Sequence, residues 1–183
     1  GGCGKTTFLE AALLTTGVIK KLGKVEDGNT VSDYDKMEIE KGYSINTSIV
    51  PIEWKDSKIN FIDTPGYFDF VGEVNAALRA AEAAVIMVDA GSGIQVGTEA
   101  AWKACERYKT PRFIVINKRD KDEFDFYKTF EELKAKFGST LVPLSWPLSA
   151  EIDEDLKEAI ASADDELMEK YFNGDEFTDE EIK

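Results

Sequence analysis

Short apolar runs of strand-like pattern alternate with stretches of helical spacing, and this alternation limits the possible fold more than any other feature of the chain. The first two runs are joined by the polar residues 55–58 and predict a β-hairpin. The later two are separated by a helical stretch and predict parallel strands, because a parallel pair needs a long crossover connection. The pattern predicts an α/β fold with a mixed, mostly parallel sheet flanked by helices. The apolar runs cover residues 50–54, 59–62, 84–88 and 113–116, and the helical stretches cover 72–83 and 98–108.

The composition is that of a folded acidic protein, and it excludes several classes of catalytic site. The chain has 183 residues with 22 basic and 36 acidic side chains, so its formal net charge is −14. Hydrophobic residues make up 43%, enough to bury a core, and we expect one globular domain with room for an appendage. Histidine is absent, which excludes Ser-His-Asp and Cys-His nucleophiles, imidazole bases and most catalytic zinc sites.

Charge and hydropathy also bear on partners and compartment. We expect no non-specific binding to nucleic acid, because that affinity comes from Lys and Arg contacts with phosphates, although docking at one site on an RNA–protein machine stays open. The longest apolar run, 83–88, is far shorter than the ~20 residues of a membrane span, so we expect no membrane association. Cys3 and Cys105 lack metal-ligand spacing, which favours a reducing compartment and hence the cytoplasm.

The last third of the chain is predicted to be mainly helical. A helix is expected over 122–137, where apolar residues recur at helical spacing. The run 141–146 has strand character but contains Pro143, which suits an edge strand. Residues 151–183 are strongly acidic and are predicted to be helical through Tyr171. We interpret their charge as a solvated helix face rather than a binding tail.

The chain opens on a glycine-rich motif that matches the end of the pattern G-x-x-x-x-G-K-[ST]. Small residues in this pattern let backbone N–H groups surround phosphate oxygens at a helix N-terminus. Lys5 would reach the β- and γ-phosphates, and the Thr6 hydroxyl would bind Mg²⁺. Two interpretations of Cys3 stay open, a small filler of the loop or a thiol activated by the helix N-terminus. The predicted phosphate site consists of Gly1, Gly2, Cys3, Gly4, Lys5, Thr6 and Thr7.

A second motif, Asp63-Thr64-Pro65-Gly66, follows the strand expected at 59–62. It places the Asp63 carboxylate at the C-terminal end of a strand, where the carboxylate can hold Mg²⁺ through water. Gly66 leaves a backbone N–H free for the γ-phosphate. Taken alone, D-x-x-G is a weak signal, because an ordinary turn after a strand explains it as well.

A third motif, Asn117-Lys118-Arg119-Asp120, follows the strand expected at 113–116 and indicates the base. Asp120 can accept hydrogen bonds from guanine N1–H and from the exocyclic amine, whereas adenine presents an acceptor there. A site built on such hydrogen bonds can discriminate by a factor on the order of 10⁴. Asn117 would support the loop, and Lys118 would lie over the base. The three motifs together predict a guanine-nucleotide site.

With these motifs the chain resembles the GTP-binding domain of translational GTPases, most closely the elongation factor G group with its paralogues. The similarity runs along nearly the whole sequence. The resemblance implies a P-loop GTPase domain that binds GTP and GDP with Mg²⁺, hydrolyses GTP slowly to GDP and phosphate, and works with the ribosome in the cytoplasm. Beyond the three motifs, it is carried by residues 13–17, 28–34, 68–71, 93–98 and 166–171.

The resemblance also implies that residues 35–47 are the first switch segment. Ser44 stands there where the family usually has a Mg²⁺-binding threonine, so the implied metal group consists of Thr6, Ser44 and Asp63. Lys41 stands where the family commonly has arginine. No arginine finger in cis is visible in the motifs.

Position 67 departs from the family pattern, which usually has a catalytic histidine there to orient the attacking water. The chain has Tyr67 instead, and a phenol of pKa ~10 can donate a hydrogen bond but is no ready base at neutral pH. We expect Tyr67, Gly66 and Lys5 to serve hydrolysis. The alternatives are a GTP-dependent binding switch with little hydrolysis, and a ribosomal-protection or release-type factor. Gly2 replaces a frequent aspartate, which argues against a monovalent-cation site.

Two regions are implied by the resemblance. Residues 1–146 would form the P-loop GTPase domain without the strand that leads into the phosphate loop, and 147–183 an acidic helical part of an inserted subdomain. Ser149-Ala150 spells the family's base-supporting motif, and we interpret it as a chance match, with the true motif as the alternative. On the first interpretation, residues of the family pattern are missing between Trp146 and Glu151.

Overall fold

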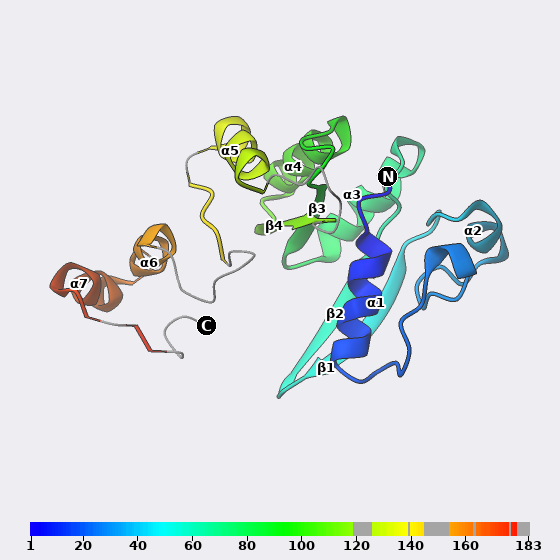
Figure 1. The fold of residues 1–183 in the computed structure, drawn as a ribbon, viewed down its shortest axis with the longest axis horizontal. Coiled ribbons are helices and arrows are strands. Elements are labelled where there is room, and N and C mark those ends of the chain that lie inside the picture. The colour runs from blue at the N-terminus through cyan, green and yellow to red at the C-terminus, as the bar shows by residue number, and fades with distance from the viewer. Residues whose placement is uncertain (119–125, 139, 145–153, 163, 176, 179–183) are drawn as a thin grey trace. The chain divides into compact units, whose positions relative to one another are not determined.

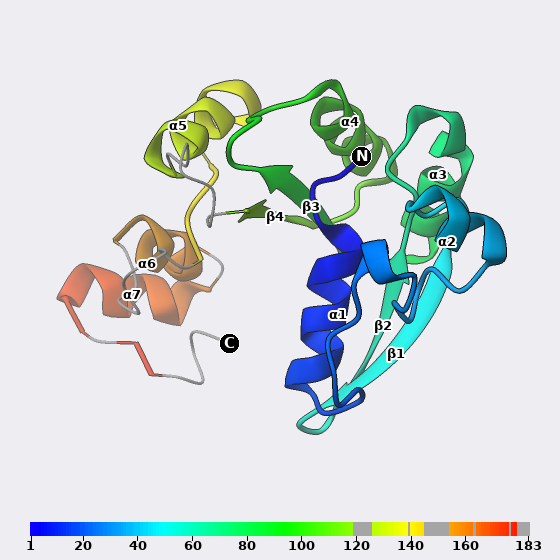
Figure 2. The same ribbon diagram turned by 45° about the vertical axis from the view of Figure 1, so that its right-hand side comes forward.

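The computed structural model describes residues 1–118, 126–138, 140–144, 154–162, 164–175 and 177–178. The chain divides into two compact units, Gly1–Phe130 and Glu131–Lys183. Figures 1 and 2 show the order of elements in the first unit. With η for a 3₁₀-helix, these are α1 (Lys5–Thr15), η1 (Val25–Asp27), α2 (Lys36–Lys41), β1 (Ser48–Trp54), β2 (Ser57–Asp63), η2 (Phe68–Phe70), α3 (Val71–Ala80), β3 (Ala84–Asp89), α4 (Val96–Tyr108) and β4 (Arg112–Asn117).

The predicted hairpin is confirmed by the antiparallel pairing of β1 with β2. Pairing reaches Trp54 opposite Ser57, so the connecting loop has only two residues. Lys55, the first of them, has a φ of 51°, the left-handed conformation that two-residue hairpin turns favour. Alternate residues of β1 are buried, and they share a core cluster with α1 that consists of Leu9, Leu13, Val50 and Ile52.

The predicted parallel pair is formed by β3 and β4. Its register places Asp89 beside Asn117, so the carboxyl ends of both strands lie together. The crossover between the strands contains α4, as expected, while α3 precedes β3 and ends at Ala80 because Ala81 has extended backbone with a ψ of 141°. These elements share a second core cluster of Leu78, Ile86 and Cys105.

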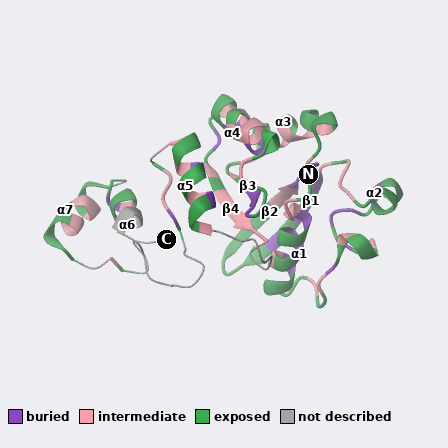
Figure 3. Ribbon diagram, turned by 45° about the horizontal axis from the view of Figure 1, so that its top comes forward, coloured by how far each residue is buried: buried purple, intermediate pink, exposed green. Residues whose placement is uncertain are grey.

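The strands among the described residues of the first unit form two pairs, and the expected mixture of antiparallel and parallel pairing in an α/β fold is confirmed. Among the described residues, β2 and β3 each have one partner strand. Buried residues concentrate in α1, β1 and β3, whereas α2 is mostly exposed (Figure 3). The motifs that end β2 and β4 therefore lie at strand ends, while the first switch segment contains a short surface helix.

Among the described residues of the last part of the chain, the helices are α5 (Phe126–Phe137), α6 (Glu154–Ala161) and α7 (Asp165–Asn173). The helix predicted over 122–137 is confirmed from Phe126 onward, and its first residues lie outside the described ones. The acidic stretch is divided into α6 and α7, because the Asp164 carboxylate accepts from two backbone N–H groups and caps α7. Within the described ranges, no helix combines the length and apolar character needed to cross a membrane.

The edge strand predicted over 141–146 is wrong for the residues that the structure describes there. Residues 141–144 have irregular backbone, and Pro143 has no N–H group to donate to a neighbouring strand. The predicted region boundary at residue 146 and the dipeptide Ser149-Ala150 lie outside the described residues. Both stay predictions.

Candidate functional site

The glycine-rich loop at the start of the chain is held in shape by its own backbone and by one side-chain amide. Gly2 and Gly4 have φ values of 71° and 90°, in the left-handed region that favours glycine. Gly4 is the N-cap of α1, so the free N–H groups of the first helical turn point toward the loop. Asn117 Nδ2 donates to the Cys3 carbonyl at 3.0 Å. A Cβ atom on Gly4 would lie 2.4 Å from that nitrogen, so the loop and the end of β4 fit only with glycine there.

The turn after β2 lies directly against this loop. The Gly1 nitrogen donates to the Gly66 carbonyl at 3.0 Å. A Cβ atom on Gly66 would lie 2.5 Å from Lys5 Nζ and 3.1 Å from Gly1 Cα. The structure thus brings together Lys5 and Gly66, which are predicted to act on the same phosphate.

A buried group of hydroxyls surrounds the Asp63 carboxylate at the end of β2. The Thr6 hydroxyl donates to Asp63 Oδ2 at 3.1 Å and lies 3.4 Å from Ser44 Oγ. The Ser32 hydroxyl donates to the same Asp63 oxygen at 3.0 Å. Burial raises the pKa of the Asp63 carboxyl, and the hydrogen bonds from Ser32 and Thr6 and the charge of Lys5 oppose this rise. The three residues of the implied metal group therefore lie in contact.

A second carboxyl group, Asp33, faces the same place. It is only 5% exposed, and its Oδ2 has no hydrogen-bond partner among the described residues. Burial raises the pKa of Asp33, a hydrogen bond with Ser44 lowers it, and the charges of Asp63 and Glu38 raise it further. An unpartnered buried carboxylate oxygen near the Ser44 hydroxyl and the Asp63 carboxyl is suited to a bound cation.

Asp33 and Ser32 were not predicted as site residues, because neither forms part of a nucleotide-binding motif. The only signal in the sequence is their place within residues 28–34, which lie immediately before the first switch segment. Ser32 is also fixed through its backbone, since the Ser48 hydroxyl donates to its carbonyl at 2.7 Å. The start of β1 thereby positions this segment.

The part of the site predicted to bind the guanine base lies at the carboxyl ends of β3 and β4. Lys118 has a φ of 64°, and its Nζ lies 2.7 Å from Asp89 Oδ2. The hydrogen bond and charge of Lys118 lower the pKa of the Asp89 carboxyl. The ion pair holds the Lys118 side chain at the edge of the parallel pair. Asp120, the predicted guanine ligand, lies outside the described residues.

The remaining predicted residues lie around the loop. Tyr67 follows Gly66, is 48% exposed, and has its ring next to Gly1 and to Tyr43 of the first switch segment. Cys3 is half-buried, with Sγ 3.7 Å from the Gly1 carbonyl oxygen. Thr7 is exposed on α1.

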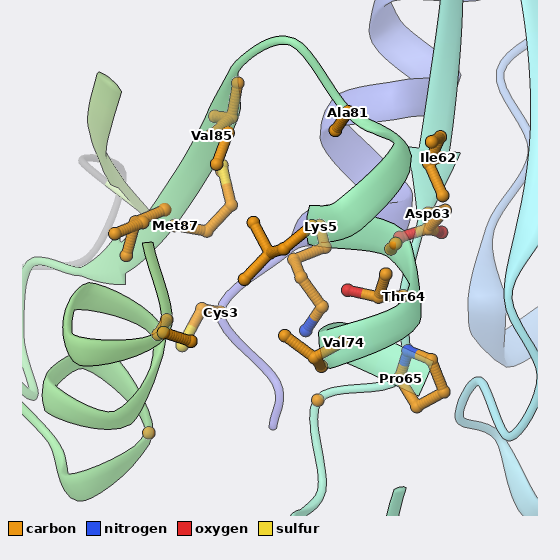
Figure 4. A pocket seen from close by; sticks show the side chains of 18 of the residues that line it. Cys3, Lys5, Ile62, Asp63, Thr64, Pro65, Val74, Ala81, Val85 and Met87 are labelled. Atoms are coloured by element: carbon orange, nitrogen blue, oxygen red, sulfur yellow. The ribbon is translucent and has the colours of Figure 1, made fainter. Parts of the chain in front are cut away.

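A cavity of about 450 Å³ extends from the loop into the space between β2 and β3. Figure 4 shows Cys3 and Lys5 beside it, with Ile62 of β2 on one side and Val85 and Met87 of β3 on the other. Its loop end is polar, whereas its lining between the strands is mostly apolar. The polar end adjoins the residues predicted to bind phosphate.

The sequence matches a protein-family model and is similar to curated proteins. The family model for the elongation factor Tu GTP binding domain matches residues 2–179. An elongation factor G of Granulibacter bethesdensis is 46% identical over 148 residues, which make up 81% of this chain and 21% of that protein. An elongation factor G of Gluconobacter oxydans is 45% identical over 148 residues, with coverages of 81% and 21%. The chain thus spans about a fifth of the length of these curated relatives.

The fold is also similar to a solved structure. A crystal structure of a protein from Thermus thermophilus matches with a TM-score of 0.85 and 34% sequence identity. The match covers 99% of this chain and 33% of that one. The likeness to this solved structure therefore holds for the fold as well as for the sequence.

Proposed function

Since the chain belongs to the family of the elongation factor Tu GTP-binding domain, we propose that it binds GTP with Mg²⁺ and hydrolyses it slowly to GDP and phosphate. The protein would be a translation factor resembling elongation factor G that acts on the ribosome in the cytoplasm. One observation carries the proposal: Lys5, Thr6 and Asp63 meet at one edge of the fold, at the N-terminus of α1.

The glycine-rich loop would bind the phosphates. Its left-handed glycines and the free N–H groups of the first α1 turn provide donors without side-chain obstruction. Lys5 would neutralise charge on the β- and γ-phosphates, and the Gly66 N–H would contact the γ-phosphate. The close approach of Gly66 to Lys5 supports this pairing of roles.

The hydroxyl and carboxyl group around Asp63 fits a Mg²⁺ ion. Thr6 and Ser44 would hold the metal through their hydroxyls, and the carboxylates of Asp63 and Asp33 would offset its charge. The unpartnered Asp33 Oδ2 is the feature that a cation would satisfy. When bound, Mg²⁺ supplies neutralisation of the phosphate charge that develops during hydrolysis.

Guanine would be bound by the N-K-x-D motif. The hydrogen bond from Asn117 to the Cys3 carbonyl connects this motif to the phosphate loop. The residues that would bind the base are therefore fixed relative to those that would bind the phosphates. Lys118, held by Asp89, would cover the base, and Asp120 would accept from its Watson–Crick edge.

Hydrolysis would depend on Tyr67, with Gly66 and Lys5, because the chain has no histidine. A tyrosine hydroxyl can orient water by a hydrogen bond but is a poor base at neutral pH, so the intrinsic rate should be slow. The tyrosine in place of a histidine also favours one alternative, a GTP-dependent binding switch with little hydrolysis. A ribosomal-protection or release-type factor is a further alternative that differs in other domains.

The domain organisation is part of the proposal. Residues 1–146 would form the P-loop domain, and 147–183 part of an inserted helical subdomain. A strand that leads into the phosphate loop would fill the space between β2 and β3. The apolar lining of that space, and the single partner strand of β2 and of β3 among the described residues, support this placement.

The deciding experiment measures GTP turnover by the full-length protein with and without ribosomes, beside GTP and GDP affinities. A slow intrinsic rate that ribosomes stimulate is the expected result. Tight GTP binding without turnover under either condition would favour the binding switch. Lack of preference for guanine over adenine nucleotides would contradict the proposed function altogether.

A further inference from the structure

The beginning of α5 is attached to the end of β3 by a buried hydroxyl. Residues 126–130 of this helix belong to the first unit. Thr129 is 3% exposed, and its hydroxyl donates to the Ala90 carbonyl at 3.1 Å. Ala90 directly follows β3 and is 6% exposed, so water has little access to this carbonyl. The Thr129 hydroxyl therefore satisfies a buried acceptor.

The Ala90 carbonyl shares one planar peptide group with the Gly91 N–H. In a trans peptide the two point in opposite directions, and this N–H donates to Asp89 Oδ1 at 3.0 Å. Because the group is rigid, a hydrogen bond that fixes the direction of the carbonyl also fixes the direction of the N–H. The Thr129 hydroxyl thus orients a donor to one oxygen of the Asp89 carboxylate.

The other oxygen of the Asp89 carboxylate holds the lysine of the N-K-x-D motif. Asp89 is 7% exposed, and its Oδ2 lies 2.7 Å from Lys118 Nζ. A chain of contacts therefore runs from the Thr129 hydroxyl through the peptide group and the carboxylate to the Lys118 ammonium group. Hydrogen bonds arranged in such a chain polarise and strengthen one another.

The backbone of Ala90 is attached to the same motif. Its N–H donates to the Asn117 carbonyl at 3.0 Å. Asn117 and Lys118 precede residues 119–125 in the chain, and Thr129 follows them. The chain on both sides of this stretch is thus hydrogen-bonded to the same two residues, Asp89 and Ala90.

We propose that Thr129 is a positioning residue for the guanine site, which orients Lys118 through the Ala90–Gly91 peptide group and the Asp89 carboxylate. This inference rests on the proposed function, in which Lys118 covers the base. Thr129 itself touches no nucleotide, because its side chain is buried against the end of β3. Its hydroxyl is required for this role. A valine in its place would keep the shape of the side chain but not the donor.

The test compares Thr129→Val with Thr110→Val in the full-length protein. Thr110 is a matched control, because it is 5% exposed and its hydroxyl also donates to a backbone carbonyl, that of Leu78 at 3.4 Å. It lies just before β4, at the opposite end of that strand from Asn117. Equilibrium titration with a fluorescent GDP analogue, and its displacement by GDP and GTP, give the affinities, and thermal unfolding shows that each variant is folded.

Thr129→Val is expected to weaken GDP and GTP binding equally, since both carry the same base. The loss should be roughly two- to tenfold, the factor that corresponds to one net protein hydrogen bond. Thr110→Val should leave both affinities unchanged. Thr129→Ser keeps the hydroxyl and should bind both nucleotides like wild type.

A double-mutant cycle with Asp89→Asn locates the effect. This substitution removes the charge that holds Lys118, so Thr129→Val should cause no further loss in the Asp89→Asn background. The inference is overturned by a Thr129→Val loss that persists in that background, by equal losses in Thr129→Val and Thr110→Val, or by a Thr129→Val variant that binds like wild type. A wild-type protein that binds no guanine nucleotide contradicts the proposed function itself, and that result distinguishes the two failures.

Discussion

At the scale of single residues, the most unusual group is the Asp33 carboxyl, which is buried near the carboxyl groups of Asp63 and Glu38 and is also within reach of the Lys5 charge. Burial raises its pKa, so the folded protein binds a proton there more strongly than the unfolded chain does. Stability without ligand should therefore fall as the pH rises through the ordinary carboxyl range toward the raised value. A bound cation would reverse this by favouring the charged form.

Asp33→Asn should raise the stability of the nucleotide-free protein and weaken its binding of Mg²⁺. In nucleotide-free protein at neutral pH, the variant should unfold at a higher temperature than wild type, because an amide carries no buried charge. Its Mg²⁺-dependent GTP affinity should fall by roughly ten- to hundredfold, the usual effect of losing a supporting group beside a metal site. Thermal unfolding at pH 4 and pH 7 and GTP titration with and without Mg²⁺ measure both effects. Asp27→Asn on the exposed surface is the control, and an unchanged Mg²⁺ dependence would contradict the role of Asp33.

Asp120→Asn should change the preferred base. The carboxylate accepts from guanine N1–H and the exocyclic amine, whereas an amide can donate to the additional carbonyl of xanthine. Guanine nucleotide affinity should fall by roughly 10³-fold or more and xanthine nucleotide affinity should rise. Competition between GTP and xanthosine triphosphate in the full-length protein measures the ratio. Unchanged GTP affinity would refute the assignment of the base site.

Tyr67→Phe tests the hydroxyl that replaces the family's histidine. If this hydroxyl orients the attacking water, hydrolysis should fall by roughly 10–10³-fold, the scale of losing one stabilising donor, with nearly unchanged GTP affinity. Tyr67→His should raise ribosome-stimulated turnover. Single-turnover rates with and without ribosomes give both values. A Tyr67→Phe variant as fast as wild type would show that the ring only packs.

At the scale of elements, the buried side chain of Glu38 organises the segment between α2 and β1. Its Oε1 accepts from two backbone N–H groups, and its Oε2 accepts from Asp35 N at 3.3 Å in a capping box. Glu38→Gln replaces one acceptor by a donor facing an N–H group. The variant should lose ~1–3 kcal/mol of stability, the cost of leaving a buried donor unsatisfied.

Hydrogen exchange in a second variant, Glu38→Ala, provides the specific measurement, because this substitution removes both carboxylate oxygens. The amides of Ile45 and Asn46 should exchange faster, because they lose their acceptor, while amides of the β1–β2 ladder should keep their protection. Glu40→Ala on the exposed face of α2 is the matched control. Equal protection of Ile45 and Asn46 in both variants would mean that Glu38 does not hold this segment.

Elements with a clear periodic pattern were predictable, and buried polar groups were not. The period-two pattern of β1 follows from its alternating burial, and the polar link before Ile59 indicates the hairpin. Glu38 and Asp33 are acidic residues in a polar stretch, and such residues are normally exposed. Their partners are backbone N–H groups and distant side chains, which no local pattern reveals. Residues 141–144 show the opposite error, an apolar run that suggested a strand but has irregular backbone.

At the scale of the whole molecule, the candidate site is assembled from segments far apart in the chain. Thr6 and Asp63 are 57 residues apart, and Cys3 and Asn117 are 114 residues apart, yet both pairs are hydrogen-bonded. The motifs predicted this meeting, because the carboxyl ends of strands and the N-terminus of a following helix share one edge of an α/β sheet. The contact between Tyr43 and Tyr67 was not predictable, since it depends on the path of the switch segment.

The space between β2 and β3 leads to a prediction about the intact protein. Val85 of β3 lines this cavity and is 42% exposed, although its neighbours in the strand form part of the core. If a strand that leads into the phosphate loop occupies the space, Val85 becomes buried, and Val85→Lys should cost more than ~2 kcal/mol in the full-length protein because it places an unpaired charge in an apolar interior. Ile49→Lys, at a β1 position that is 68% exposed, should cost only about 0.5 kcal/mol. Denaturant unfolding of both variants gives the comparison, and equal small costs would show that the space between the strands stays open to water.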